Sequence, residues 1–451
     1  MNRLIERCAM LDIHKSQITA CVRVPDDAGG RRQQIREFQS TTSGLLLLAD
    51  WLRSWAVTVV GMESTGVYWR AVFYLLEGEF ECRLYNARHL RHVPGRKSDV
   101  QDAEWGCQLV EHGLVRTSFV PPRPLRELRD LVRYRKAKIQ ERTREVQRVE
   151  KTLQDAGIKL SSVASEVLGV SARRMLDALI SGTHDPEVLA DLAKGALRKK
   201  IPALREALQG RFTGHHALLI GQMLAQIDFL DETIATLSER VEELTRPFSR
   251  EIELLDTIPG IDKRAAEMLL AEIGPDMTQF PTEHHLASWA GLCPGQRESG
   301  GKKHSAATRK GSKWLRGTLT ESAKAVVRTK GTYLSARYHR IKSRRGHAKA
   351  TIATGHKILT AAYHVLSRGV PLQRARRRVL LPPRHREHRT LPPTAHQTTR
   401  TPRPPSHPRT PPRGRLTAAV TLKPSRGPPR APAAPNPERL FSIQLRGSGA
   451  S

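Results

Sequence analysis

The sequence has few cysteines and lacks any long hydrophobic run. No run of about 18 apolar residues occurs, so no membrane span is expected. The first seven residues, Met1-Asn-Arg-Leu-Ile-Glu-Arg7, hold no apolar signal-peptide core. The cysteines show no CxxC pairing, which argues against a zinc site or a disulfide framework and suits a reducing cytoplasm. They are Cys8, Cys21, Cys82, Cys107 and Cys293.

Acidic residues are also scarce, because 44 Asp and Glu stand against 75 Lys and Arg. The resulting net charge of +31 is typical of a protein that binds a polyanion, most often nucleic acid. On charge alone, the alternative to a nucleic-acid enzyme is a ribosomal or chromatin-like basic protein without catalytic activity. At 451 residues, the chain is expected to form two or three domains.

One carboxylate stands in an apolar stretch near the N-terminus, Met10-Leu-Asp-Ile-His-Lys15. This stretch is typical of a buried strand, where the charge of Asp12 is unfavourable unless it is paired or binds a metal. Candidate partners lie downstream in two motifs. Glu63 belongs to Val59-Val-Gly-Met-Glu-Ser-Thr-Gly66, and Asp99 and Asp102 belong to Lys97-Ser-Asp-Val-Gln-Asp102.

The pattern of apolar residues around these motifs predicts a mixed sheet with helices on its faces. Residues 7–24 alternate between apolar and polar and predict two strands joined by a turn at 14–16. Further strands are expected at 34–38, 57–61 and 82–85, and helices at 42–55, 67–76 and 99–110.

The four acids favour metal-dependent chemistry. Asp99 and Asp102 are three residues apart on the expected helix, so they face the same way. Four converging carboxylates repel each other unless divalent cations neutralise them, and oxygen-only ligands select Mg²⁺ or Mn²⁺. Two such ions can activate one oxygen and stabilise another in phosphoryl transfer. The combination resembles the RNase H-like fold of RuvC-type nucleases.

Two heptad repeats occupy the middle of the chain. After Pro121-Pro-Arg-Pro124, apolar residues recur every seven positions up to Leu153, and a second run extends from about 217 to 247. We expect a coiled-coil arm that folds back on itself or dimerises, with two core helices of one bundle as the alternative. Arg135 and Arg142 interrupt the apolar d positions, and the arginines of the first helix leave it with a basic face, as a nucleic-acid contact requires. A charged face that is merely solvated is the alternative. Residues 158–210 are expected to be helical.

Residues 251–330 predict another unit. Residues 254–273 indicate a helix, a Pro-Gly hairpin and a second helix, which can expose backbone N–H groups to phosphate. An ordinary turn between two helices is the alternative. The glycine-rich loop 291–303 fails the Walker A pattern, because Gly301 stands where lysine is needed. The candidate nucleic-acid contacts here are Lys302, Lys303, Arg309, Lys310, Lys313 and Arg316, and residues 331–368 are expected to be basic and helical.

The composition changes at about Pro371. The remaining segment holds 17 of the 29 prolines and has a net charge of +15, which leaves +16 for the rest of the chain. It has too little apolar content to fold, so we expect disorder, with sequence-independent affinity for DNA or RNA as a by-product.

These motifs together resemble the DEDD-type transposases of insertion-sequence family 110, which include Piv-like DNA invertases. The resemblance covers residues from about 8 to 365. It rests on 11–15, 61–68, 97–102, the Ser299-Gly300 pair and Lys310-Gly-Ser-Lys-Trp-Leu-Arg316. It implies a RuvC-like catalytic domain at 1–120, a coiled-coil region at 121–250 and a transposase domain at 251–370. The tail at 371–451 is not a family feature.

The resemblance also implies a mechanism and partners. Asp12, Glu63, Asp99 and Asp102 would be the catalytic acids and the ligands of Mg²⁺ or Mn²⁺, and Ser299 would form a covalent phosphoserine link to DNA. The expected partners are double-stranded donor and target DNA, a structured noncoding guide RNA and a second copy of the chain, with dimers pairing into tetramers. A cytoplasmic, nucleoid-associated bacterial protein is expected.

Three serines lie in or near the loop, and only the Ser-Gly context selects Ser299 over Ser305 and Ser312. Ser312 stands where the family often has Asn, and we interpret it as structural. Two other functions remain open at this point. One is a RuvC-like, Mg²⁺-dependent endonuclease without a covalent intermediate, and the other is a non-catalytic nucleic-acid-binding protein.

Overall fold

The computed structural model describes residues 4–64, 66–86, 90, 99–295, 298–303, 307–308, 310–329 and 331–372. By its internal contacts, the chain divides into a unit of residues 1–384 and a unit of residues 385–451. The second unit lies outside the described residues, and so does the expected basic tail beyond its first two residues. No described helix is long and apolar enough to cross a membrane.

The N-terminal part is a six-stranded mixed sheet with the strand order β3-β2-β1-β4-β5-β6. The strands β1, β2 and β3 are antiparallel neighbours, β4 and β5 continue parallel to β1, and β6 closes the edge antiparallel. The predicted mixed sheet is therefore confirmed, although β6 was not expected. The strands are β1 (Cys8–Ile13), β2 (Gln17–Pro25), β3 (Arg31–Gln39), β4 (Val59–Glu63), β5 (Glu81–Tyr85) and β6 (Thr117–Ser118).

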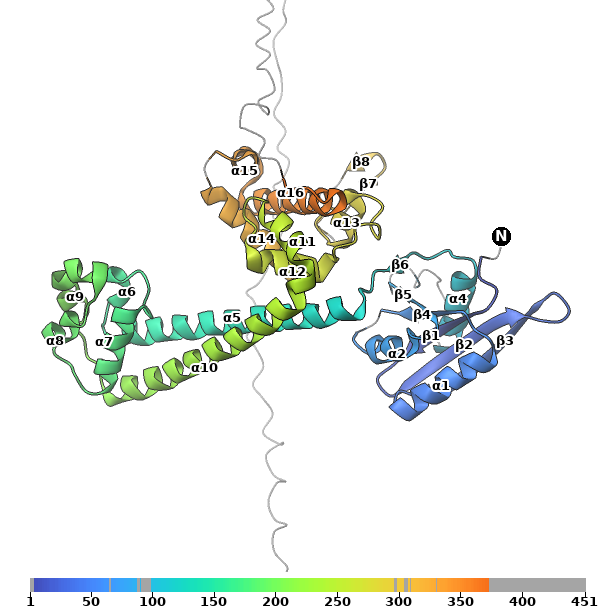
Figure 1. The fold of residues 1–451 in the computed structure, drawn as a ribbon, viewed down its shortest axis with the longest axis horizontal. Coiled ribbons are helices and arrows are strands. Elements are labelled where there is room, and N and C mark those ends of the chain that lie inside the picture. The colour runs from blue at the N-terminus through green and yellow to red at the C-terminus, as the bar shows by residue number, and fades with distance from the viewer. Residues whose placement is uncertain are drawn as a thin grey trace, which may run out of the picture. The chain divides into compact units, whose positions relative to one another are not determined.

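Helices cover both faces of this sheet (Figure 1). Because side chains alternate along β1, Leu11 and Ile13 pack against α1 (Thr42–Ser54) and α2 (Trp69–Leu76) on one face. Cys8 and Met10 point to the other face, which α4 (Asp99–Glu111) covers. Each face has its own apolar core, and the face under α4 is the one that Asp12 shares with Met10.

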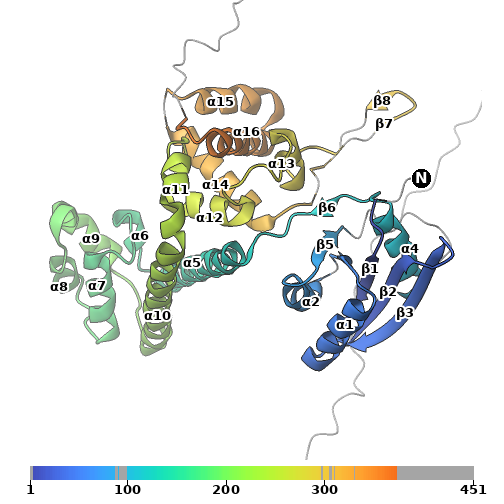
Figure 2. The same ribbon diagram turned by 45° about the vertical axis from the view of Figure 1, so that its right-hand side comes forward.

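The two heptad segments form one long helical arm. Helices α5 (Arg123–Asp155) and α10 (Gly214–Thr245) of the same chain lie side by side, as Figures 1 and 2 show. The arm therefore folds back on itself, which is one of the two expected arrangements. The helical segment between them is α6 (Leu160–Val163), α7 (Val170–Ile180), α8 (Pro186–Asp191), the 3-10 helix η1 (Gly195–Lys200) and α9 (Ile201–Ala207).

The heptad seam is not one uniform zipper. The first turns of α5, with Leu125 and Val132, pack into the core of the C-terminal helices. Its last turns, with Val149 and Leu153, pack into the core formed with α6–α9. Ile139 in the middle is only half-buried. The bundle alternative therefore describes both ends of α5, and the coiled-coil prediction describes the stretch between them.

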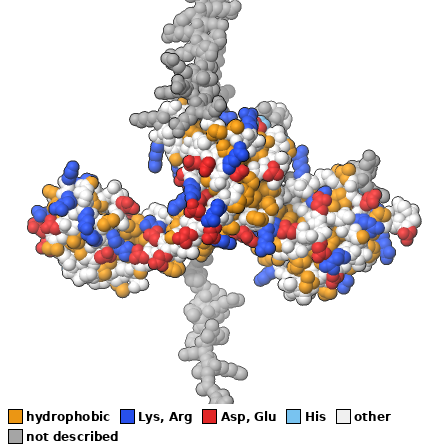
Figure 3. Space-filling model, in the orientation of Figure 1, with side chains coloured by type: hydrophobic (Ala, Val, Ile, Leu, Met, Phe, Trp, Pro, Cys, Tyr) orange, Lys and Arg blue, Asp and Glu red, His pale blue; other side chains and the backbone are white. Residues whose placement is uncertain are grey.

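Two arginines of the first heptad helix, Arg135 and Arg142, do not contribute to the expected basic face. Arg135 is buried and donates to Glu267 at 2.5 Å, and Arg142 pairs with Asp231 of α10. These arginines therefore stabilise the packing of α5 against its neighbours. Acidic and basic side chains are interspersed along the arm on the face shown in Figure 3.

The C-terminal part consists mainly of helices around one core. The predicted helix, hairpin and helix at 254–273 are confirmed, but Asp262 caps the second helix by accepting from the N–H of Ala265 at 2.8 Å. The expected open phosphate site is thus filled by a side chain, as in an ordinary turn. The elements are the 3-10 helix η2 (Arg246–Phe248), α11 (Ser249–Asp256), α12 (Lys263–Ile273), α13 (Glu283–Trp289), β7 (Glu298–Ser299), β8 (Lys302–Lys303), α14 (Lys313–Arg328), α15 (Tyr333–Arg345) and α16 (His347–Arg368).

Candidate active site

Asp12 and Glu63 stand at the carboxyl ends of two adjacent parallel strands. Residues 8–11 of β1 pair with residues 59–62 of β4, so one further step along both strands brings Asp12 level with Glu63. Side chains at paired positions point to the same face. Both acids are half-buried. The register therefore places two carboxylates next to each other on the face that α4 covers.

Helix α4 runs back along β1 on this face. The N–H groups of Leu4 and Ile5 both donate to the carbonyl of Glu111 at 3.1 Å, so the end of α4 lies beside the start of β1. In the middle of the helix, Gly106 packs closely on Met10, where an added Cβ would lie 2.7 Å from the Met10 Cγ. The first turn of α4 consequently lies toward the end of β1.

This direction brings Asp102 to the level of Asp12. Asp102 precedes Gly106 by four residues, which is about 6 Å along a helix and keeps the two on one face. Asp12 follows Met10 by two residues, which is about 6.6 Å along a strand. Asp102 is exposed. Asp99 is the first residue of α4, and its side chain lies outside the described residues.

A histidine shares the strand end with Asp12. The N–H of His14 donates to the carbonyl of Gln17 at 2.9 Å, which closes the turn at residues 14–16 between β1 and β2. The His14 Nε2 lies 3.3 Å from the Asp12 Oδ2, and the side chain of Asp12 is 20% exposed. His14 belongs to the motif at residues 11–15, but the sequence predicted no role for it. It provides a polar partner for a carboxylate in an otherwise apolar strand.

The donor set at this strand end fits a hard divalent cation in its chemistry. Carboxylate oxygens are the ligands that Mg²⁺ and Mn²⁺ prefer. Among the described residues, no three His, Cys, Asp or Glu side chains stand close enough together to hold a metal ion. The sheet places Asp12 and Glu63, whereas Asp102 lies on α4 and is exposed.

Ser299 belongs to a different structural element. It ends β7, and Gly300 and Gly301 form a two-residue turn to β8 with φ of 56° and 72°. Such a turn requires positive φ at both positions, which glycine adopts without strain. An added Cβ at either glycine would meet nothing within 4 Å. The backbone beside Ser299 is therefore open, and the Ser299 side chain lies outside the described residues.

The base of this hairpin is fastened to the helical core. Pro294 and Thr308 form a β-bridge, and the N–H of Gly295 donates to the carbonyl of Ala307 at 3.0 Å. The Arg316 guanidinium donates to the Thr308 hydroxyl. Arg316, expected to contact nucleic acid, thus holds the hairpin in place.

Of the other residues expected to contact nucleic acid, two are exposed and the side chains of three lie outside the described residues. Lys310 and Lys313 are exposed, and the Lys313 Nζ lies 5.1 Å from the centre of the Trp314 ring. Lys302 and Lys303 form β8, but their side chains are outside the described residues. Arg309 lies outside the described residues altogether.

Ser312 has a structural position, in agreement with its interpretation from sequence. Its hydroxyl donates to the buried carboxylate of Glu272 at 2.9 Å and caps α14 by accepting from the N–H of Leu315. Arg133 of α5 donates to the same carboxylate at 2.7 and 3.0 Å. One buried acid therefore joins α5, α12 and α14.

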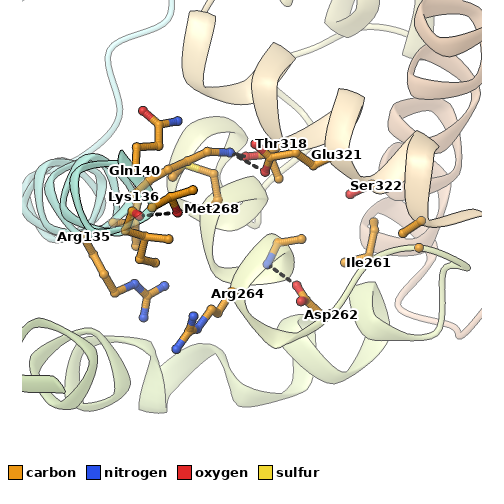
Figure 4. Close-up of a pocket in the computed structure, with 16 residues that line it drawn as sticks. Arg135, Lys136, Gln140, Ile261, Asp262, Arg264, Met268, Thr318, Glu321 and Ser322 are labelled. Atoms are coloured by element: carbon orange, nitrogen blue, oxygen red, sulfur yellow. Dashed lines mark hydrogen bonds and ion pairs between the residues drawn. The ribbon is translucent and has the colours of Figure 1, made fainter. Parts of the chain in front are cut away.

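A cavity of about 550 Å³ lies where α5, the turn before α12 and α14 meet (Figure 4). Lys136 crosses it and donates to Thr318 at 2.9 Å and to Glu321 at 2.8 Å. Arg264 also lines the cavity and is exposed. No sequence pattern indicates this cavity, because its walls come from three segments that are distant in the chain.

Comparisons with protein families match both parts of the chain. A model of the DEDD transposases of IS110 matches residues 10–158, and a model described as the transposase IS116/IS110/IS902 family matches residues 252–339. The first segment contains Asp12, Glu63, Asp99 and Asp102, and the second contains Ser299.

Individual proteins match the chain over shorter lengths. The pilin gene-inverting protein of Moraxella bovis is 32% identical over 151 residues, which is 32% of this chain and 46% of that protein. An insertion element IS110 protein of 43.6 kDa from Streptomyces coelicolor is 31% identical over 157 residues, which is 35% of this chain and 33% of that protein. The matched part therefore spans less than half of either relative.

Proposed function

The chain belongs to the IS116/IS110/IS902 family of DEDD transposases, and from this premise we propose that it cuts and rejoins DNA strands to move an insertion sequence. The register that sets Asp12 beside Glu63, with Asp102 level with them, carries the proposal. These acids would form one catalytic centre, and Asp99 would complete it from the first turn of α4.

We propose an RNase H-like fold for the N-terminal part. Three antiparallel strands followed by two parallel ones support it, as does the helix that carries acids over the central strand. The proposed domain limits are 1–120 for this part, 121–250 for the arm and 251–370 for the part with Ser299.

Asp12, Glu63, Asp99 and Asp102 would hold Mg²⁺ or Mn²⁺. A bound divalent cation supplies charge neutralisation and activation of a phosphoryl-transfer oxygen. The protein contributes rigid placement, because Asp12 and Glu63 sit on paired strands and not on loops. Their half-buried position strengthens their electrostatic effect relative to bulk water.

Ser299 would be the nucleophile. Its Oγ attacks a DNA phosphorus, a new P–Oγ bond forms and one P–O bond to deoxyribose breaks. The hydroxyl proton passes to a carboxylate of the acid set and then to the departing deoxyribose oxygen. In the rejoining step, a DNA hydroxyl attacks the phosphoserine and releases Ser299. The open glycine turn supports this role, because it lets a DNA backbone come close to the serine.

The acids and the serine lie on separate structural elements, so the active form needs them brought together. We propose dimers that pair into tetramers, in which the serine of one copy can reach the acids of another. Donor and target DNA would be selected by a structured noncoding guide RNA. Purification from the native host followed by RNA sequencing tests this part. One enriched, structured RNA supports it, and random RNA contradicts it.

Replacing the serine tests the mechanism. Ser299→Ala should abolish both cleavage and the covalent protein–DNA adduct, while Ser305→Ala, six positions further along the sequence, should keep both. Cleavage that survives in Ser299→Ala would establish the RuvC-like nuclease that uses water. If Asp12→Asn changes no activity on DNA, the protein is a non-catalytic nucleic-acid binder.

A further inference from the structure

Thr19 is a buried polar residue for which the mechanism above has no role. Its side chain is 1% exposed, and its Oγ1 has no hydrogen-bond partner among the described residues. Thr19 lies on β2 directly opposite Asp12 of β1. Cross-strand pairs of this kind have Cβ atoms about 4.5–5.5 Å apart. The hydroxyl therefore lies within reach of the Asp12 carboxylate.

The register also identifies the other neighbours of Thr19 on this face of the sheet. Cys21, two residues on along the same face, lies under α4, where the thiol of Cys107 donates to the Cys21 carbonyl at 3.5 Å. On the other side, Glu37 of β3 is paired with Thr19 and is exposed. A buried hydroxyl without a partner is unfavourable, and such groups are rare in folded proteins.

We propose that Thr19 is a positioning residue for Asp12. In the metal-loaded site, its hydroxyl donates a hydrogen bond to the Asp12 carboxylate and holds the oxygen that faces the cation in one orientation. This inference rests on the proposed function, because it assumes that Asp12 is a metal ligand. Hydrogen bonds of this outer kind orient first-shell ligands and tune metal affinity.

Binding of Mn²⁺ to the full chain, followed by electron paramagnetic resonance of the free ion, tests the proposal without DNA. Thr19→Val should weaken Mn²⁺ binding by about 10-fold or more, the usual effect of losing such a partner. Thr19→Ser keeps the hydroxyl and should bind like the wild type, whereas Thr19→Ala should bind like Thr19→Val. The two matched pairs, Thr with Val and Ser with Ala, each differ mainly in the hydroxyl.

Thermal unfolding of the metal-free variants separates positioning from folding. Thr19→Val should unfold at the same temperature as the wild type or higher, because it removes an unpartnered buried hydroxyl. Mn²⁺ binding by Thr19→Val that equals the wild type overturns the inference. So does a loss in Glu37→Gln as large as that in Thr19→Val, since the hydroxyl would then serve Glu37. Wild-type binding no tighter than that of Asp12→Asn overturns the proposed metal site itself.

Discussion

Ser312 shows how one hydroxyl can stabilise the fold close in sequence to the proposed nucleophile without a catalytic role of its own. Ser312→Ala removes the cap of α14 and the hydrogen bond to buried Glu272. We expect the free energy of unfolding to fall by about 1–2 kcal/mol, measured by urea denaturation. Ser343→Ala serves as the control, because the exposed Ser343 hydroxyl bonds only a carbonyl of its own helix. Equal stability of the two variants would contradict the structural role.

We expect His356 to make the C-terminal part sensitive to acid. Burial lowers the pKa of His356 below its ordinary value of 6.5, and the nearby charges of His284, Lys357 and Arg337 lower it further. The folded state thus favours the neutral ring. The contribution of the neutral His356 ring to the free energy of unfolding is complete above pH 6.5. It is lost as the pH falls through the lowered pKa of His356 in the folded state.

The melting temperature should therefore drop more in the wild type than in His356→Gln when pH is lowered from about 7.5 to about 5. An equal drop in melting temperature in the two proteins would show that His356 does not contribute to the acid sensitivity. The Cys293 thiol, 3.9 Å from the His356 Nε2, also faces the ring, so Cys293→Ala in the same assay separates its influence from burial.

At the residue scale, sequence patterns could single out the acids as candidates but could not indicate their neighbours. Asp12 could be recognised because a charge within an apolar strand requires a partner. Thr19 could not, since a threonine in a strand is ordinary and only the register shows that it faces Asp12. The position of His14 could not be predicted either, because it depends on how the turn at residues 14–16 closes between β1 and β2.

At the element scale, α5 depends on buried ion pairs to dock on the C-terminal helices. Arg135→Ala leaves Glu267 buried without its partner, and we expect a loss of about 3–5 kcal/mol in the free energy of unfolding. Arg144→Ala, at an exposed position of the same helix, should stay within about 0.5 kcal/mol of the wild type. Chemical denaturation measures both.

The double variant Arg135→Met with Glu267→Leu tests the reason for this loss. Removing both charges together should recover most of the stability, because neither group is then left unpaired. A double variant as unstable as Arg135→Ala would show that shape, and not charge, decides the docking of α5.

Heptad spacing predicted both long helices, but not which core each turn of α5 joins. Leu125 and Leu153 occupy the same heptad position, yet one packs with the C-terminal helices and the other with α6–α9. Periodicity reports which side of a helix is apolar, and long-range contacts decide what covers it. For the same reason, the sequence could not predict that Arg135 pairs with Glu267 on α12 and does not face nucleic acid.

At the scale of the whole molecule, Ser299 lies 197 positions after Asp102 and 287 positions after Asp12 in the sequence. Local sequence patterns do not predict whether residues so far apart come close together. Asp12 and Glu63 lie close together because the adjacent strands β1 and β4 carry them. The link from these acids to Ser299 came from family resemblance, and it remains a proposal.

The basic tail should add affinity for DNA without adding chemistry. Removal of residues 373–451 takes away 17 Lys and Arg and only two acids, while the remaining chain keeps a net charge of +16. We expect weaker non-specific DNA binding and a shallower dependence of affinity on salt, measured by fluorescence anisotropy. Full-length protein with the tail arginines changed to glutamine should behave like the truncated chain. An unchanged salt dependence would contradict an electrostatic role.

In the proposed reaction, Asp12 and Ser299 act on the same DNA phosphate. The most direct test is to trap the adduct on a DNA substrate with the co-purified RNA present and to identify the linked peptide by mass spectrometry. We predict DNA attached to Ser299 in the wild type and no adduct in either Asp12→Asn or Ser299→Ala. An adduct on another residue, or an undiminished adduct in Asp12→Asn, would contradict the account.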